Sequence, residues 1–398
     1  MFDKDKLELM YFLTRQQKLM NHAEAARVYG KIKGISERTV RRWFKALQKN
    51  QFDYFLAPNY DSLGLVPVYV VLENLSNYDF FKIHNYLYYI FSGTDFSSLK
   101  RVLIVGYLIP QNKLICFKEF MERARKLGIF DSYHIMPVQR GVFGAHTPLH
   151  SVFSGNGEIA FSEDYDVSYY INLLEHNLKK NYSRSELIAR NPLVIPVLFE
   201  YLREHWSSRK VWFNAKSKLG QNIWNYVKST SKRRTRKDSV GIKLVQETIG
   251  EINKNADNFF LQTRIDYLPF HNKSVILFML LKLKNQTTIH SFLESLAKSS
   301  VMSRFLIGRN NSGKLGVYLI TNLDKMNFIM SRLLPENCNP NFKTRVVLLD
   351  MDEYRSYYSK ARHYMKFDYS KVFDPKTCSW RYEHEKYMAE LQKLAGKA

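Results

Sequence analysis

The order of strand-like and helix-like segments constrains this chain most, because the same order occurs twice. In the second half, the strand, helix, strand, strand, helix and strand patterns span residues 274–283, 287–299, 302–307, 315–321, 324–334 and 346–349. In the first half, strand patterns span residues 65–72, 99–109 and 132–138, and helical patterns span residues 77–91 and 113–127. A turn around Gly106 would be needed to divide the middle pattern into two strands. Two β-α-β-β-α-β units predict a duplicated ferredoxin-like α+β fold, with both helices of each unit on one side of its sheet.

A short segment before the first unit, residues 21–50, has the pattern of two helices around a tight turn. Asn21 stands at an N-cap position, and Glu24 three residues later can complete a capping box. Ser36 caps the second helix after a break at Gly34. The apolar stripe of this helix consists of Val40, Phe44 and Leu47. The spacing predicts a helix-turn-helix, with a strand or wing following at residues 51–60.

The outer face of this second helix is strongly basic. Residues 31–49 hold seven cations and one acid, Glu37, which is unlike the mixed charge of an ordinary solvated helix. A solvated helical hairpin is the alternative interpretation. We expect this face to dock into the major groove of DNA. The expected contacts are Ser36, Arg38, Thr39, Arg41 and Arg42 at the groove and Lys31, Lys33, Lys45 and Lys49 at phosphates.

A weaker helical region precedes the second unit, in residues 191–260. Its last helical pattern, residues 241–255, has an apolar stripe but a mixed outer face that is poor for phosphate contact. The loop before that pattern, residues 228–237, holds six cations and no acid, and a sequence-independent grip on the DNA backbone is expected there. The expected second DNA anchor is Lys232, Arg233, Arg234, Arg236 and Lys237.

The charge of the whole chain favours a polyanionic partner. With 60 Lys plus Arg against 37 Asp plus Glu, the 398 residues carry a formal charge of +23. Such a surface attracts nucleic acid and displaces its counterions. No apolar run reaches the roughly 18 to 20 residues that cross a bilayer, and Met1 leads directly into a charged helical pattern without a signal-peptide core. We therefore expect a soluble, cytoplasmic, nucleoid-associated protein with no membrane partner.

Three patterns could indicate enzymatic or metal chemistry, and each has a simpler interpretation. Residues 308–314, GRNNSGK, have the spacing of a phosphate-binding loop, but Leu315 replaces the hydroxyl residue and a strand pattern follows. His146 and His150 flank a proline, with no third ligand nearby. Asp350, Asp352 and Glu353 fit an acidic helix N-terminus. Three separated cysteines do not make a disulfide framework or a paired-thiolate zinc site. We expect no catalytic residue, no metal and no cofactor.

The chain divides into six expected parts. They are a winged helix-turn-helix at 1–60, a ferredoxin-like module at 61–140, a linker with a helix at 141–190, a divergent helical or winged-helix-like domain at 191–260, a second ferredoxin-like module at 261–350 and a helical tail at 351–398. The first pair of domains is thus expected to recur in divergent form in the second half.

Two short sequence segments resemble those of a known family. ISERTVRRWFKAL at residues 35–47, and DSLGL at residues 61–65 leading directly into an apolar strand, resemble the Lrp/AsnC-type (feast/famine) archaeal transcription regulators. The resemblance covers residues 1–140 well and residues 191–350 in outline. It implies a winged helix that reads operator DNA and a sheet module that pairs with another copy of itself.

The chain departs from this family in two ways. Both copies lie in one polypeptide, which indicates an intramolecular pseudo-dimer with two sheets face to face; a homo-oligomer is the other arrangement. Residues 106–108 and 308–310 lack the glycine-plus-acid signature that such modules carry, so the resemblance does not extend to a small-molecule effector.

The leading hypothesis from the sequence is a sequence-specific, non-enzymatic transcription regulator that binds double-stranded DNA. One alternative is an architectural, nonspecific DNA-binding protein. Another is a DNA-processing enzyme, such as a replication initiator or a recombinase-like protein.

Overall fold

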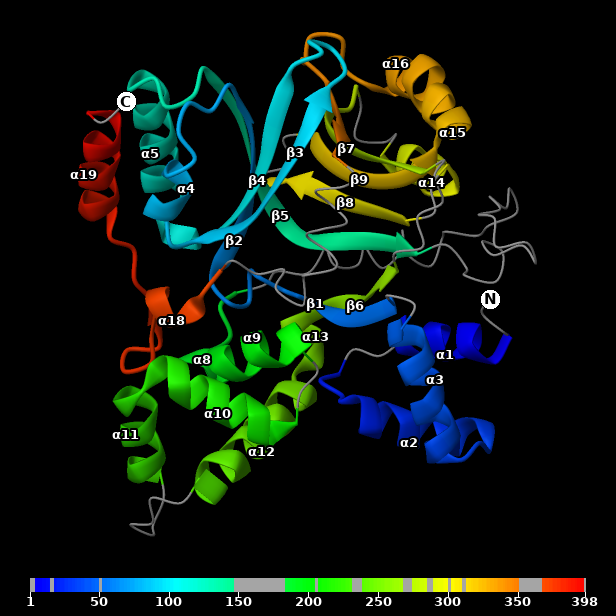
Figure 1. The fold of residues 1–398 in the computed structure, drawn as a ribbon, viewed down its shortest axis with the longest axis vertical. Helices are drawn as coiled ribbons and strands as arrows, with labels where there is room; N and C mark the ends of the chain where they lie inside the picture. The colour runs from blue at the N-terminus through cyan, green and yellow to red at the C-terminus, as the bar shows by residue number, and fades with distance from the viewer. Residues whose placement is uncertain are drawn as a thin grey trace.

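Eight antiparallel strands form a closed barrel in the computed structural model (Figure 1). The structure describes residues 4–14, 18–49, 52–146, 183–204, 207–230, 238–267, 274–284, 289–299, 302–309, 313–350 and 367–396. The order of strands around the barrel is β10-β3-β4-β2-β5-β8-β9-β7. The first unit supplies β2 Leu65–Glu73, β3 Leu87–Asp95, β4 Arg101–Pro110 and β5 Ser132–His146. The second unit supplies β7 Ser274–Lys282, β8 Met302–Gly308, β9 Lys314–Asn322 and β10 Arg345–Leu349.

Closure of the barrel contradicts the predicted fold class, a winged helix plus ferredoxin-like module in duplicate. The two units do not form separate sheets stacked face to face. They share hydrogen bonds edge to edge at two seams, where β10 pairs with β3 and β5 pairs with β8. Two open sheets would leave four exposed strand edges, whereas closure pairs every edge.

The inner surface of the barrel is a packed core. Inward-facing side chains alternate along each strand, as the pleat requires. They include Tyr69, Val71, Phe91, Ile104, Met136, Phe278, Ile320 and Val347. Gly106 provides space for an aromatic ring, because a Cβ atom there would lie 2.6 Å from Cε1 of Tyr89. The hydroxyl groups of Tyr89 and Tyr318 hydrogen-bond across the barrel at 2.6 Å.

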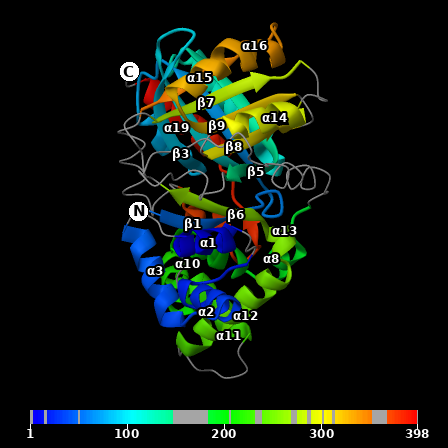
Figure 2. The same cartoon turned by 90° about the vertical axis from the view of Figure 1, so that its right-hand side faces the viewer.

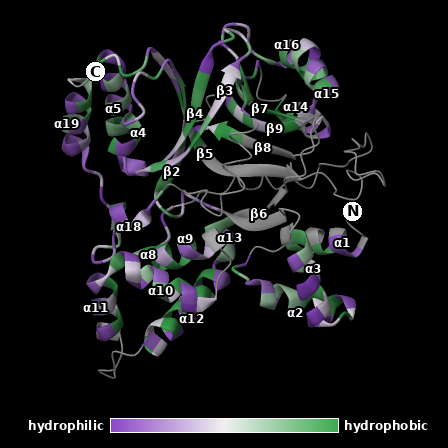
Figure 3. Cartoon of the chain, viewed as in Figure 1, coloured by the Kyte–Doolittle hydropathy of each residue, from purple (hydrophilic) through white to green (hydrophobic). Residues whose placement is uncertain are grey.

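Short helices cover the outside of the barrel (Figure 1). On the first unit these are α4 Phe80–Ile83, the 3-10 turn η1 Gln111–Lys113 and α5 Leu114–Lys126. On the second unit they are α14 Ile289–Lys298, α15 Leu323–Phe328, the π-helical η4 Ile329–Leu333 and α16 Leu334–Asn337. β4 is hydrophobic along most of its length, while exposed helices such as α2 and α19 alternate hydrophilic and hydrophobic residues (Figure 3).

A helical layer lies on the other side of a two-stranded ribbon (Figures 1 and 2). The N-terminal helices are α1 Lys4–Thr14, α2 His22–Lys33 and α3 Glu37–Lys49. The helices of the second half are α8 Glu186–Arg190, α9 Val194–Glu204, α10 Ser208–Leu219, α11 Gln221–Thr230, α12 Asp238–Lys254 and α13 Ala256–Phe259. β1 Phe52–Pro58 pairs antiparallel with β6 Phe260–Tyr267, about 200 positions away, and not with a local wing hairpin.

The C-terminal segment begins with α18 Tyr369–Val372, which packs against the helical layer. A small hairpin follows, β11 Phe373–Asp374 and β12 Ser379–Trp380, and then α19 His384–Ala395 along the first unit. No helix in the described ranges is both long enough and apolar enough to span a bilayer.

One predicted helix, residues 77–91, is wrong. Only residues 80–83 are helical, and β3 begins at Leu87. The aromatic and aliphatic residues of this stretch fit a period of 3.6 as well as a period of 2, and the burial of alternate residues from Leu87 onward shows which period the fold uses. The hairpin turn lies at residues 96–100, where Leu99 has a φ of 55°, and not at Gly106.

Substitution of Gly106 by alanine is expected to destabilise the barrel. The added Cβ meets the ring of Tyr89, and overpacking in a closed core costs roughly 1 to 3 kcal/mol. Gly250→Ala is the control, because nothing lies within 4 Å of that position and alanine favours the helix. Urea unfolding compares the two variants. Equal stability of both would contradict the packed barrel.

Candidate functional site

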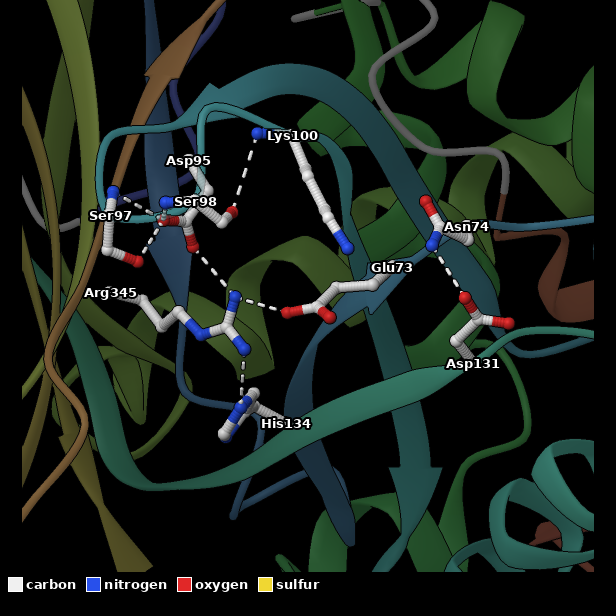
Figure 4. Close-up of polar contacts among 9 residues, drawn as sticks. All are labelled: Glu73, Asn74, Asp95, Ser97, Ser98, Lys100, Asp131, His134 and Arg345. Atoms are coloured by element: carbon white, nitrogen blue, oxygen red, sulfur yellow. Dashed lines mark hydrogen bonds and ion pairs between the residues drawn. The ribbon is translucent and has the colours of Figure 1, made fainter.

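The first residue of β10, Arg345, is a buried cation at one end of the barrel. It is 1% exposed. Its Nη1 donates to Oδ2 of Asp95 at 2.8 Å and pairs with the carboxylate of Glu73, and its Nη2 lies 3.0 Å from Nε2 of His134. Figure 4 shows the guanidinium between these three side chains. A single arginine therefore joins β10 to three strands of the first unit.

Strand topology brings these residues together. β2 ends at Glu73, β3 ends at Asp95, and β10 begins at Arg345, so antiparallel order places all three at the same end. His134 lies opposite Val71 near the start of β5. We call this end of the barrel, where β7 ends and β9 begins, the Arg345 end.

Asp95 also fixes the turn that follows β3. Its Oδ1 accepts hydrogen bonds from the backbone N–H of Ser97 at 2.8 Å and of Ser98 at 3.3 Å, and from the hydroxyl of Ser97 at 2.5 Å. The other oxygen remains for Arg345. Asn74 donates to Asp131 at 2.6 Å beside this network (Figure 4). Both Asp95 oxygens therefore have fixed partners.

Hydrogen bonds set the charge of both carboxylates. Burial alone would raise the pKa of Asp95, but bonds from Ser97 and Arg345 outweigh it and hold this pKa below its usual range. Burial opposes the same shift at Glu73, where the contact with Arg345 and the charge of Lys343 lower the pKa. Both groups are therefore carboxylates at neutral pH, sharing one guanidinium.

His134 is held in a neutral form. Burial, followed by the charge of Arg345, lowers its pKa below the ordinary value. Because arginine only donates, Nε2 of His134 must accept this hydrogen bond, and we assign the ring proton to Nδ1. His134 is only partly buried. It is thus a fixed hydrogen-bond donor and a poor base, since its lone pair is already engaged.

Three lysines lie beyond Arg345 at the same end. Arg345 lies opposite Leu280, and two residues further along β7, Lys282 lies directly opposite Lys314. Because side chains alternate along a strand, Lys282 lies on the same side of β7 as inward-facing Leu280. Lys314 lies on the same side of β9 as Gly316, where an added Cβ would point inward at Met136. Lys343 precedes Arg345 by two residues, and its charge acts on Glu73 and His134. Lys282, Lys314 and Lys343 are called the lysine row below.

Two observations indicate that polar groups at this end lack hydrogen-bond or ion-pair partners among the described residues. Nε of Arg345 is buried and has no hydrogen-bond partner among the described residues. Lys282, Lys314 and Lys343 form no ion pair within the same part of the chain, although Lys314 lies 5.8 Å from the ring centroid of Phe342. Like charges placed opposite each other on neighbouring strands are unfavourable. An anion bound at this end would supply an acceptor for Nε of Arg345 and would reduce the repulsion between the lysines.

A separate polar cavity of about 420 Å³ lies below the barrel. Its lining includes Ser62, Arg184, Glu186 and Arg190. Both arginines are engaged, because Arg184 donates to the carbonyl of Cys378 and Arg190 pairs with Glu186. The Arg345 end has the stronger claim to a ligand.

The predicted DNA-binding residues of α3 lie together on one face. Arg38, Arg41, Arg42 and Lys45 are exposed, with Arg41 paired to Glu37. Lys33 pairs with Glu8 at 2.7 Å, Lys31 is exposed, and Thr39 hydrogen-bonds to Ser36 at 2.9 Å. The side chain of Lys49, and all of Lys232, Arg233, Arg234, Arg236 and Lys237, lie outside the described residues.

Sequence reasoning missed the residues of the Arg345 end. The available signal was charge within apolar strand patterns, since Arg345 opens RVVLL and Glu73 closes LVPVYVVLE. Of the other candidates, Asp350 is exposed, whereas His150, Asp352 and Glu353 lie outside the described ranges. No group of three or more His, Cys, Asp or Glu side chains in those ranges is placed to hold a metal ion.

Comparison with known proteins gave matches among solved structures, whereas no family model and no curated protein matches the chain. Similarity was found to the "siroheme decarboxylase NirDL" over 98% of this chain and 99% of that one, at 10% identity and a TM-score of 0.45. A structure of the same protein "in co-complex with iron-uroporphyrin III analogue" matches over 90% and 98%, at 10% identity and a TM-score of 0.41. A "putative monooxygenase" from Fusobacterium nucleatum matches over 74% and 92%, at 5% identity and a TM-score of 0.26.

These matches correct the functional predictions. A member of the Lrp/AsnC-type regulators, a non-enzymatic transcription regulator and a double-stranded DNA partner were expected. The matching structures are instead named as enzymes, and one is a complex with an iron-porphyrin analogue. None of the matched structures is named as a DNA-binding regulator, which contradicts the predictions of family, regulatory function, absence of enzymatic activity and DNA partner, and these predictions are not retained.

Arg345→Met is expected to destabilise the protein by about 3 to 5 kcal/mol. It removes the cation while leaving buried Asp95 and partly buried Glu73 uncompensated. Lys343→Met, at an exposed position two residues away, should change stability by less than about 0.5 kcal/mol. Urea unfolding at neutral pH measures both; a loss in Arg345→Met no larger than in Lys343→Met would show that the network is dispensable.

Acid should act differently on the wild type and on Arg345→Met. The lowered pKa values of Asp95 and Glu73 mean that their stabilisation is complete above roughly pH 4 and is lost as pH falls through the folded-state values. Without the guanidinium, burial is less opposed and both pKa values rise. The wild type should therefore lose more unfolding free energy than Arg345→Met as the pH falls below roughly 4, so the difference in stability between the two proteins should shrink in acid; a difference that stays constant with pH would refute this.

Proposed function

We propose that the protein binds a small anionic molecule at the Arg345 end of the barrel. The observation that carries the proposal is the lysine row, which comes from β7, β9 and the segment leading into β10, with a buried guanidinium one layer below it. Four cations, Lys282, Lys314, Lys343 and Arg345, stand against two carboxylates, Glu73 and Asp95. The cluster therefore carries two positive charges that its own carboxylates do not balance.

The carboxylates cannot also neutralise the lysines. Asp95 and Glu73 are already committed to Arg345 and to hydroxyl or backbone donors. Bringing Lys282 and Lys314 face to face raises the energy of the free protein. A bound anion removes that repulsion, so part of its binding free energy comes from relief of like-charge contact.

The spacing of the row indicates the size of the ligand. Neighbouring strands lie roughly 4.8 Å apart, so three adjacent strands present cations across about 10 Å. One carboxylate or phosphate cannot reach all three. The site therefore fits a molecule with two or more anionic groups, and His134 would supply a neutral donor at its edge.

The arrangement supports binding and orientation and assigns no reaction. His134 is held neutral with its acceptor nitrogen occupied, so it is unsuited to abstract a proton. Iron-uroporphyrin III, a polycarboxylate, is a useful probe because an analogue of it is named in one matching structure.

The binding test uses citrate, pyrophosphate and iron-uroporphyrin III in isothermal titration calorimetry. At least one multivalent anion should bind, and acetate, with one anionic group, should bind far more weakly. The double variant Lys282→Met/Lys314→Met should lose at least about tenfold in affinity, since each charge-assisted contact is worth more than about 1 kcal/mol.

Lys254→Met, an exposed position on α12 in the helical layer, is the matched control and should bind as the wild type does. Failure of all three multivalent anions to bind, or equal affinity in the double variant, would overturn the proposal.

A further inference from the structure

The C-terminal segment from residue 367 to residue 396, here called the strap, fastens the helical layer to the first unit (Figure 1). Phe367 and Trp380 pack against Phe199 of α9. Nε1 of Trp380 donates to the carbonyl of Leu63 at 2.7 Å. Beyond it, α19 lies along α4 and α5. The strap thus contacts two parts of the molecule that lie far apart in the sequence.

His84, directly after α4, is the buried polar residue beneath the strap. It is 2% exposed. Its Nε2 lies 3.2 Å from the hydroxyl of Tyr382 in the strap. Rings surround it on every side, with centroids 4.6 to 5.7 Å away; they belong to Tyr86, Tyr107, Phe117, Phe120, Tyr382 and Tyr387. Such a site accepts an imidazole and penalises an imidazolium.

The titratable groups that the structure describes around His84 offer no compensation for a positive charge. Tyr86 and Tyr107 face it from the first unit, and Tyr382, Tyr387 and His384 face it from the strap. From α5, Cys116 and Glu119 lie next to Tyr382, and Glu119 is 3.6 Å from His384. Glu119 therefore lies against His384 of the strap and not against His84. Burial, followed by the charge of His384, lowers the pKa of His84 to about 3.

The same interface leaves polar atoms unsatisfied. Oη of Tyr107 and Nδ1 of His384 are buried without a hydrogen-bond partner among the described residues. Each such group costs roughly 1 to 3 kcal/mol relative to a hydrated one. The strap therefore docks less tightly than its aromatic contacts alone would give. As a result, one added charge at this interface is enough to shift the equilibrium toward release.

We infer that the strap is a pH-sensitive clasp, docked on α4 and α5 while His84 is neutral and released when His84 takes up a proton. Release would transfer His84 to water, where it titrates as an ordinary histidine. The proton prefers the released state, so docking is complete above the ordinary histidine pKa and weakens as pH falls below it. This inference does not depend on the ligand proposed for the Arg345 end.

Amide hydrogen exchange of the full-length protein tests the clasp. Between pH 7 and pH 5, after correction for intrinsic rates, protection of α19 should fall by about 25-fold, the factor expected when a group of pKa about 6.5 is held near 3. Protection of β4 in the barrel should change far less over the same range. Equal loss in β4 would mean general unfolding and would overturn the inference.

Two variants separate titration from packing. His84→Phe keeps an aromatic ring but cannot be protonated, so the pH dependence of α19 exchange should disappear. Tyr382→Phe removes only the hydrogen bond and should lower protection at both pH values while keeping the pH dependence. A matched change in the helical layer, His22→Phe in α2, should leave the α19 response intact. Persistence of the response in His84→Phe, or its absence from the wild type, would refute the clasp.

Discussion

The ion pair network of Arg345 is the constraint on which the architecture depends. Asp95 and Arg345 are 250 positions apart in sequence, yet their side chains meet in a site that excludes water. Burying one arginine is costly unless its charge is balanced, and burying Asp95 and most of Glu73 is costly for the same reason. Only a closed barrel, with β10 against β3, satisfies all three at once. The network thus favours closure over two separate sheets.

The same closure creates the basic end. Strands that terminate together place their end residues together, so lysines from β7, β9 and the approach to β10 converge above Arg345. Because the carboxylates are used to neutralise the guanidinium, the lysines have no counter-charge within the part of the chain that the structure describes. The stability of the seam and the affinity for an anion therefore derive from one distribution of charge.

Local elements were predictable from the sequence, whereas their assembly was not. The first strand pattern, residues 65–72, and the helix pattern, residues 113–127, match β2 and α5 within one residue at each end, because continuous apolar runs and helical periodicity are local signals. Periodicity shows which face of a strand is buried but not which strand lies beside it. The pairing of β5 with β8, and of β1 with β6, therefore could not be read from the pattern, and neither could a site built from Glu73, His134 and Arg345.

These long-range pairings also bear on how the chain acquires its structure. The first unit alone would expose β3 and β5 as edge strands, and it would hold Asp95 and Glu73 close together without a cation. Exposed edges and like charges both favour association with other chains over independent folding. Contacts between distant segments must form before they stabilise anything, which slows folding. The halves of this protein are therefore similar in element order but not independent in stability, since each supplies what the other lacks at the seam.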